Sequence, residues 1–302
     1  MNKRKLRDLI GTKLMLTAVL FVFIIFFIIF TLLLYKSTLV LESHSITEIL
    51  FSSTWKPAAV GGEFGLAPVI VGTILVTGIA LIIAIPISLL TAIYIAEYAP
   101  KRIRRTLRPF IDVLAGVPSV VYGLCAFLFL VPLVKDVIAP WFGVQCTGLC
   151  IFTAAVILSV MVFPIIISLC IESFDAIPIA LKEASLSVGA TKWETIKKVV
   201  FRASAPGIIS AILLGFGRAF GETVAVYMVI GGVGIPTQIP SSLFQPGNTL
   251  ASMIVSGFSE LMSIPVEESA LMLVALILFV VVLLFNLIGR LIIRRAKKRW
   301  SY

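Results

Sequence analysis

Two residues of opposite charge stand inside a long apolar stretch of the sequence. Arg218 and Glu222 are the only Asp, Glu, Lys or Arg residues between positions 207 and 232. Residues four apart share one face of a helix and are close enough to pair. An ionisable group near the middle of a bilayer costs at least about 2.5 kcal/mol, so such residues usually face a cavity or a partner and mark a solute pathway. The sequence therefore predicts a transport site here.

The chemistry of this site points to an anion. The planar guanidinium of Arg218 matches the oxygens of phosphate or another tetrahedral oxyanion through two parallel hydrogen bonds. Thr223 adds a hydroxyl beside Glu222, and the small residues Gly215, Gly217 and Gly221 let a neighbouring helix or a solute approach closely. Glu222 either holds Arg218 while the site is empty or repels a fully ionised anion, and a purely structural ion pair stays open as an alternative.

A second polar interruption lies in another apolar stretch. Between Gly116 and Gly123 the sequence places Pro118, Ser119 and Tyr122. A proline kinks a membrane helix, and neighbouring groups or a water-filled cavity must then satisfy the freed backbone groups. We expect Ser119 and Tyr122 to line the solute pathway, with a simple kink as the alternative.

The elements that hold these residues are predicted to be membrane helices. Of the 302 residues 60% are hydrophobic and 13% are charged, and the mean hydropathy is +1.12. About 20 apolar residues cross a bilayer as a helix. Six such stretches occur, at residues 14–35, 68–96, 110–134, 148–171, 207–232 and 269–292. The first is longer than the apolar part of a signal peptide and is predicted to be a membrane anchor. We predict one all-α, multi-pass membrane domain over residues 1–302, with a transport core at 68–292.

The net charge of +10 is explained by topology. Lys and Arg gather at residues 3–13, 101–108, 182–202 and 290–299, which alternate with loops that are poor in cations. Positive residues remain on the cytoplasmic side, so both termini are predicted to be cytoplasmic in a chain of the inner membrane, with lipid and not nucleic acid as its surroundings.

Covalent chemistry is not expected of this chain. His44 is the only histidine, so no triad of Ser, His and Asp and no histidine-based metal site can be assembled. The phosphate-binding loop that would hold ATP is also absent from the sequence. We therefore predict no catalytic residue, no metal ligand and no bound cofactor. Cys146 and Cys150 share a loop, and whether they form a disulfide stays open.

The segment 172–206 carries the local signals of two helices joined by a tight turn. Pro178 suits a first helical turn, and Gly189 suits the residue just after a helix end. Thr191 and Glu194 have the spacing of a capping box at the start of the second helix. Such a cytoplasmic element is either a connector or a docking site for a partner protein.

The region that follows the fifth apolar stretch is rich in helix-breaking residues. Gly231, Gly232, Gly234 and Pro236 precede a moderately apolar run at 250–258. Irregular backbone at membrane depth needs surrounding protein or a water-filled cavity. We therefore expect either a broken, re-entrant segment at an outer gate, over residues 237–268, or a plain surface loop.

The segment 172–206 resembles the cytoplasmic motif of the transmembrane permeases of ATP-binding-cassette importers. In that family the motif is Glu-Ala-Ala, three residues, Gly, nine residues and Ile-x-Leu-Pro. Here it reads Glu183, Ala184, Ser185, then Gly189, and ends at Arg202 in place of the proline. The resemblance implies a type I (MetI-like) permease fold, in which Glu183, Ala184, Ser185, Gly189, Thr191 and Glu194 form the site that couples transport to the ATPase.

Other stretches resemble the phosphate-specific permeases of the PstC type. These stretches are 55–57, 64–65, 72–73, 114–123 and 217–223, while 61–62 and 96–98 are similar to the sister permease of the PstA type. The resemblance implies a role for Arg218 and Glu222 in phosphate transport. It further implies a second permease subunit of the PstA type, two ATP-binding subunits that use ATP and Mg, and an extracytoplasmic phosphate-binding protein. A PstA-type role, another oxyanion, and an ion-coupled transporter or channel that acts alone are the alternatives.

Overall fold

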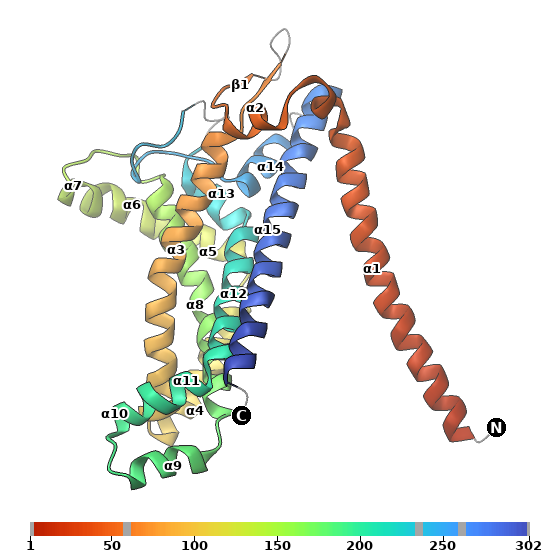
Figure 1. The fold of residues 1–302 in the computed structure, drawn as a ribbon. Coiled ribbons are helices and arrows are strands. Elements are labelled where there is room, and N and C mark those ends of the chain that lie inside the picture. The colour runs from red at the N-terminus through yellow and green to blue at the C-terminus, as the bar shows by residue number, and fades with distance from the viewer. Residues whose placement is uncertain (1–2, 57–61, 233–237, 259–263, 301–302) are drawn as a thin grey trace.

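The computed structural model describes residues 3–56, 62–232, 238–258 and 264–300 of the chain. These residues are mainly helical (Figure 1), and their one sheet is a short antiparallel pair of β1 (Trp55–Lys56) and β2 (Glu63–Phe64). A helix satisfies its own backbone hydrogen bonds, as a chain in lipid requires. The expectation of an all-α fold is confirmed for the described part of the chain.

The first half of the chain contains the long helices α1 and α3, the basic helix α4 and a spanning segment made of short pieces. These elements are α1 (Lys3–Ser43), α2 (Ile46–Phe51), α3 (Ala67–Ile93), η1 (Tyr94–Tyr98), α4 (Lys101–Ala115), α5 (Ser119–Cys125), η2 (Ala126–Leu130), α6 (Val131–Leu133), η3 (Val134–Ile138) and α7 (Ala139–Trp141). The elements marked η are π-helical turns, so the segment from α5 to α7 is a single irregular helix.

The second half contains the central helix and the segment that carries the importer motif. Its elements are α8 (Ile151–Asp175), α9 (Ile179–Ser187), α10 (Lys192–Thr195), η4 (Ile196–Val200), α11 (Phe201–Ala203), α12 (Ala205–Gly221), α13 (Val224–Ile230), α14 (Leu250–Phe258) and α15 (Pro265–Trp300).

Five described helices are long and apolar enough to cross a membrane. They are Ile10–Ser43, Ala67–Tyr98, Ser119–Trp141, Ile151–Asp175 and Pro265–Arg294. A sixth candidate is bent, because Lys192–Ala203 and Ala205–Gly221 meet at an angle of 70°. The six predicted spans therefore correspond to five single candidates and one bent pair.

The predicted third span, 110–134, is wrong in its limits. Helix α4 already begins at Lys101 and ends at Ala115, and the apolar helix starts anew at Ser119. Pro118 restricts Val117 to an extended or turn conformation, and Gly116 caps the end of α4. The break separates a basic amphipathic helix from an apolar one, and the apolar periodicity of the sequence ran across it.

The predicted fifth span, 207–232, is also interrupted. Helix α12 ends at Gly221, Glu222 has an extended backbone (φ −74°, ψ 125°), and α13 begins at Val224. Helix α13 then ends at Gly231, whose φ of +77° lies in the left-handed region that favours glycine. The interruption falls beside Arg218 and changes the predicted site.

Helix α8 is the centre of the packed bundle, with α3, α4, α12 and α13 against it. The approach of α12 depends on Gly215, since a Cβ there would lie 2.8 Å from the side chain of Ile166. The expectation that small residues bring helices together is thus confirmed at Gly215. No helix of the described chain approaches Gly217 or Gly221, where an added Cβ would meet nothing within 4 Å, so the alternative of a solute beside them stays a prediction.

Helix α1 touches the rest of the chain mainly through α15. The Phe26 and Phe279 ring centroids are 5.1 Å apart, and Lys36 pairs with Glu268 at 2.9 Å. Figure 1 shows that α1 leans away from the bundle toward its N-terminal end. Much of its apolar surface is therefore uncovered within this single chain.

The region after α13 contains a buried helix in its described part. Helix α14 packs against α15, α13 and α3, and Leu250 donates its backbone N–H to Thr73 Oγ1 at 2.9 Å. A plain surface loop is therefore the wrong description of residues 250–258, and a role as an outer gate stays a prediction. Four residues of the stretches discussed from the sequence lie outside the described ranges, namely Pro57, Gly61, Gly234 and Pro236.

Candidate functional site

Arg218 lies in the last turn of α12 and its side chain is exposed. The flanking Gly217 and Gly221 leave open space around this part of the helix. Within the described residues, no Asp or Glu carboxylate lies within 4 Å of the guanidinium. A cation that is open on one side and free of a carboxylate partner is chemically ready to bind an anion.

Tyr122 is the predicted pathway residue that the fold brings to Arg218. The guanidinium acts electrostatically on the Tyr122 side chain, although the two residues are far apart in the sequence. The Tyr122 hydroxyl donates a hydrogen bond of 2.9 Å to the carbonyl oxygen of Leu114. The tyrosine thus spans the break between α4 and α5 and lies within electrostatic reach of the charge on α12.

Glu222 does not pair with Arg218, so the predicted pair on one helical face is wrong. Because α12 ends at Gly221, the two side chains no longer follow one helical register. Glu222 Oε1 instead accepts a hydrogen bond of 3.4 Å from the backbone N–H of Ala225, at the start of α13. The carboxylate therefore caps the second half of the broken helix, which leaves the guanidinium uncompensated.

Ser119 and Thr223 lie at the two breaks. Ser119 is the first residue of α5, one turn before Tyr122, and is half-buried. Thr223 donates its hydroxyl to the carbonyl oxygen of Gly221 at 3.1 Å, so its side chain serves the break itself. The breaks are held together by Gly123, where a Cβ would lie 3.0 Å from the Cα of Ala225. Ser119 thus lies at the start of α5, and Glu222 and Thr223 lie between α12 and α13, which packs against α5.

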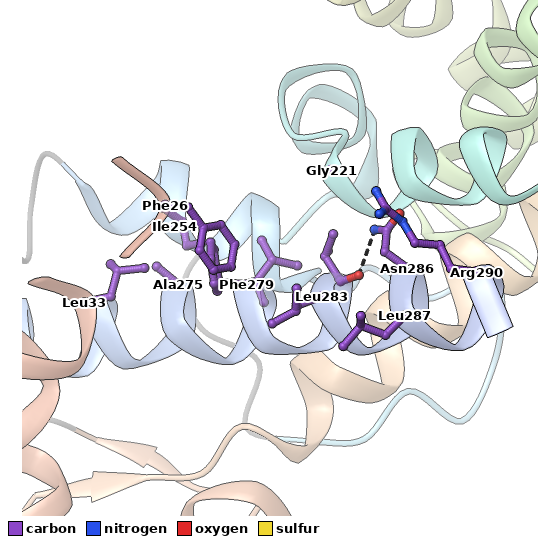
Figure 2. Close-up of a pocket in the computed structure, with 12 residues that line it drawn as sticks. Phe26, Leu33, Gly221, Ile254, Ala275, Phe279, Leu283, Asn286, Leu287 and Arg290 are labelled. Atoms are coloured by element: carbon purple, nitrogen blue, oxygen red, sulfur yellow. Dashed lines mark hydrogen bonds between the residues drawn. The ribbon is translucent and has the colours of Figure 1, made fainter. Parts of the chain in front are cut away.

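A cavity of about 600 Å³ opens beside this junction, between α1, α12, α14 and α15. Figure 2 shows that apolar side chains line most of its length and that Asn286 and Arg290 lie at the end near Gly221. Sequence reasoning assigned Arg290 to the basic cluster at the C-terminal end and missed this position. The separation of Arg290 from Arg218 along the chain does not indicate that Arg290 lies near the end of α12, because α12 and α15 meet only through the tertiary fold.

The segment 172–206 has the predicted form of helix, glycine turn and helix. Helix α9 starts after Pro178, and Gly189 follows the helix with a φ of +85°. Thr191 Oγ1 accepts the N–H of Glu194, and the Glu194 carboxylate accepts the N–H of Thr191 at 3.0 Å. The predicted capping box is therefore confirmed. The pKa of the Glu194 carboxyl is lowered, first by the Thr191 N–H and then by Lys198.

The motif residues of this segment divide into exposed and bridging positions. Glu183 and Ala184 are exposed on α9, whereas Ser185 is half-buried and its hydroxyl lies 2.9 Å from that of Thr195. This contact holds the two helices of the segment together. Exposed apolar side chains also lie on this surface, namely Ile179, Leu181, Leu186, Val188 and Trp193. An apolar surface of this kind is typical of a protein interface.

Two contacts that the sequence did not reveal fix the segment to η1, the π-helical turn that follows α3. Lys182 pairs with Glu97 at 2.6 Å, and the Glu97 side chain is only 10% exposed. The Lys192 ammonium lies 4.5 Å from the ring centroid of Tyr98, a cation–π contact. These partners are far apart along the chain, so no local spacing could have indicated them.

The loop before α8 holds the two cysteines whose pairing the sequence left open. Both Cys146 and Cys150 have free thiols. Cys150 is buried, its sulfur lies 3.3 Å from Thr153 Oγ1, and burial raises the pKa of its thiol. Its backbone N–H donates to Val229 at the end of α13.

Comparison with known proteins assigns the architecture to a family. The family described as the inner membrane component of binding-protein-dependent transport systems matches residues 84–299. The chain belongs to this family. The matched range includes the Arg218 junction, the segment 172–206 and most of α15.

Relatives of this permease are similar over most of their length. The phosphate transport system permease protein PstC of Pasteurella multocida is 37% identical, over 83% of this chain and 81% of that protein. A probable phosphate transport system permease protein PstC of Methanocaldococcus jannaschii is 34% identical, over 99% of this chain and 98% of that protein.

Solved structures show the same permease fold at lower identity. A chain of the MetNI methionine ABC transporter, in an inward-facing conformation, is 18% identical with a TM-score of 0.55, over 74% of this chain and 93% of that one. A chain of a bacterial ABC transporter that imports alginate is 19% identical with a TM-score of 0.54, over 95% and 98%. The predicted fold of an importer permease of the MetI-like type is therefore confirmed.

Proposed function

We propose that this chain is the transmembrane permease subunit of an ATP-driven importer that carries inorganic phosphate across the cytoplasmic membrane by alternating access. The observation that carries the proposal is Arg218, an exposed guanidinium at a helix break that has no carboxylate partner among the described residues. A tetrahedral oxyanion fits a guanidinium that is free to donate two hydrogen bonds. The PstC names of the relatives favour phosphate over other oxyanions.

The pathway in this proposal passes between the breaks of α5 and α12. Tyr122 and Ser119 line one side, and Arg218, Glu222 and Thr223 line the other. The open positions of Gly217 and Gly221 support this arrangement, since they leave room beside the cation. The phosphate-binding protein delivers the anion at the extracytoplasmic end, and a second permease subunit of the PstA type completes the pathway.

The energy for transport comes from two ATP-binding subunits that dock on the segment 172–206. Glu183, Ala184, Ser185, Gly189, Thr191 and Glu194 form this coupling segment, and ATP and Mg are used by the partner subunits. Its exposed apolar residues and its rigid capping box support a docking role. The basic clusters favour cytoplasmic positions for this segment and for both termini.

Labelled phosphate uptake tests the proposal. Transporter-deficient cells would express the complete complex with this chain, with Arg218→Ala, or with the exposed Arg105→Ala as a matched control. A charge-assisted hydrogen bond is worth about 1.5–3 kcal/mol, so Arg218→Ala is expected to reduce uptake about tenfold or more. Sulfate and molybdate uptake measures selectivity. Normal transport by an assembled Arg218→Ala complex contradicts the assigned site, and a lone chain that transports in liposomes contradicts the importer.

A further inference from the structure

A cluster of three charged residues lies where α8 leads into the coupling segment. Asp175 is the last residue of α8, and α9 begins four residues later. The Asp175 carboxylate accepts hydrogen bonds from Arg104 through both of its oxygens, and Arg108 contacts one of them. A carboxylate at a helix C-terminus is unfavourable by itself, because it faces the negative end of the helix dipole. The two guanidiniums of α4 therefore stabilise Asp175 where it stands.

Helix α4 is fixed to α8 at a second point. Ser168 donates its hydroxyl to Asp112 Oδ1 at 2.9 Å, seven residues before Asp175 on α8. Four residues separate Arg108 from Asp112 on α4, so the two helices run antiparallel along the contact. Two attachments of this kind hold α4 in one register on α8. Any displacement of the α8 end with the coupling segment then carries α4 with it.

The other end of α4 reaches the transport site. The Leu114 carbonyl, in the last turn of α4, accepts the hydrogen bond of the Tyr122 hydroxyl, and Tyr122 lies within electrostatic reach of Arg218. Helix α4 therefore contacts Asp175 near one end and Tyr122, next to the candidate anion site, at the other. The coupling segment also continues directly into α12 through Ser204, where the chain bends by 70°. Two arms thus lead away from the coupling segment. The first is α12, which carries Arg218, and the second is α4, which holds Tyr122 of α5 through the Leu114 carbonyl.

We propose that Arg104, Arg108 and Asp175 are positioning residues that make α4 move with the coupling segment. Movement of the ATPase subunits then changes the position of Tyr122 relative to Arg218. The inference rests on the proposed function, because it requires ATPase subunits that dock on this segment. When the segment moves, the arm of α12 carries Arg218, and the arm of α4 moves Tyr122 of α5 through the hydrogen bond to Leu114. Without the ion cluster the α4 arm loses its attachment next to the segment, and the two sides of the site no longer move together.

The first experiment measures the ratio of phosphate imported to ATP hydrolysed by the complete complex in proteoliposomes. The variants are Asp175→Asn, the double change Arg104→Gln with Arg108→Gln, and all three changes together. Mutations along a coupling route change the coupling by about 0.5–2 kcal/mol, which is about a two- to thirty-fold lower ratio at retained ATPase activity. The triple variant is expected to be no worse than Asp175→Asn, since all act through one cluster.

A matched control and a second readout separate this role from stability alone. Lys36→Gln removes the Lys36–Glu268 ion pair, which is similarly exposed but lies between α1 and α15, and it is expected to leave the ratio unchanged. Hydrogen exchange of residues 114–123 needs no transported substrate. Trapping the ATPase subunits with nucleotide is expected to change exchange there in the unmodified complex and not in Asp175→Asn.

The outcomes separate the two proposals. If the unmodified complex imports no phosphate, the proposed function fails, while hydrogen exchange still decides the inference. If phosphate is imported and Asp175→Asn keeps both the normal ratio and the nucleotide-dependent exchange, the inference is overturned. Additive losses in the triple variant would also contradict the proposal that the three residues act as one cluster. Loss of the ratio together with loss of the exchange response supports it.

Discussion

Glu222→Gln tests whether the carboxylate serves the helix break or the transported anion. Glu222 Oε1 accepts the Ala225 N–H at 3.4 Å and has no contact with Arg218 within ion-pair distance. The amide of glutamine keeps an acceptor oxygen at the same place and removes only the charge. We therefore expect a small effect on transport and a much larger one for Arg218→Ala.

The size of the effect follows from this geometry. A carboxylate near a helix start contributes about 0.3–1 kcal/mol through the helix dipole. A loss of that size changes a rate by a factor of about five at most. A buried ion pair behaves differently, because removal of one partner costs about 3–5 kcal/mol and would reduce transport by about a hundredfold or more. The expected loss of transport rate in Glu222→Gln thus differs by more than an order of magnitude between a helix-capping carboxylate and a buried ion pair.

Initial rates of labelled phosphate uptake by the complete complex in proteoliposomes distinguish them. The set contains the unmodified chain, Glu222→Gln, Arg218→Ala and the double variant, with ATP hydrolysis measured in parallel as the control for assembly. We expect the double variant to show the product of the two separate effects. The reasoning is refuted if Glu222→Gln alone is as damaging as Arg218→Ala and the double variant is no worse than either.

Three further predictions concern packing and the coupling segment. In Gly72→Ala the new Cβ would lie 2.2 Å from the Asn248 backbone oxygen, so we expect the free energy of unfolding to fall by about 1–3 kcal/mol and the melting temperature in detergent to fall with it. Gly78→Ala, where the new Cβ has no neighbour within 4 Å, should keep the melting temperature of the unmodified chain. Thr191→Ala removes the cap of α10, which costs about 0.5–2 kcal/mol, and should speed proteolysis within the segment 190–200 while leaving the melting temperature of the bundle unchanged. Because the pKa of Glu194 is lowered, its capping contribution is complete above the ordinary pKa range of a glutamate and is lost as the pH falls through the lowered pKa. Amide hydrogen exchange of residues 191–198, corrected for the intrinsic rate, should therefore rise only in acid. Glu194→Gln should remove this pH dependence.

Local features of the fold followed from the sequence because they depend on neighbours along the chain. The turn at Gly189 and the capping box of Thr191 and Glu194 are formed within a few residues, and both occur as expected. Long apolar stretches likewise predict membrane helices, because a bilayer of fixed thickness demands them. The motif after Glu183 indicated the family for the same reason, since it lies within one short segment.

The role of Arg218 and Tyr122 in a solute pathway stays a prediction, and the arrangement around them was not available from the sequence. Apolar periodicity continues across Gly116 and across Glu222, so neither helix break was placed. Each break is held by contacts from elsewhere, such as the approach of Gly123 to Ala225. A side chain can be assigned to a helical face only when the helix is known to continue.

The sequence by itself determined that this chain is a bundle of membrane helices with Arg218 in an apolar stretch and a helix–turn–helix segment at 172–206, because composition, helix caps and a short motif carry that information. Only the tertiary structure decided that Arg218 stands without Glu222, that Tyr122 joins it, and that Asp175 is held by Arg104 and Arg108. These contacts join residues of separate helices, and their positions are set by how the helices pack, which no spacing along one helix encodes.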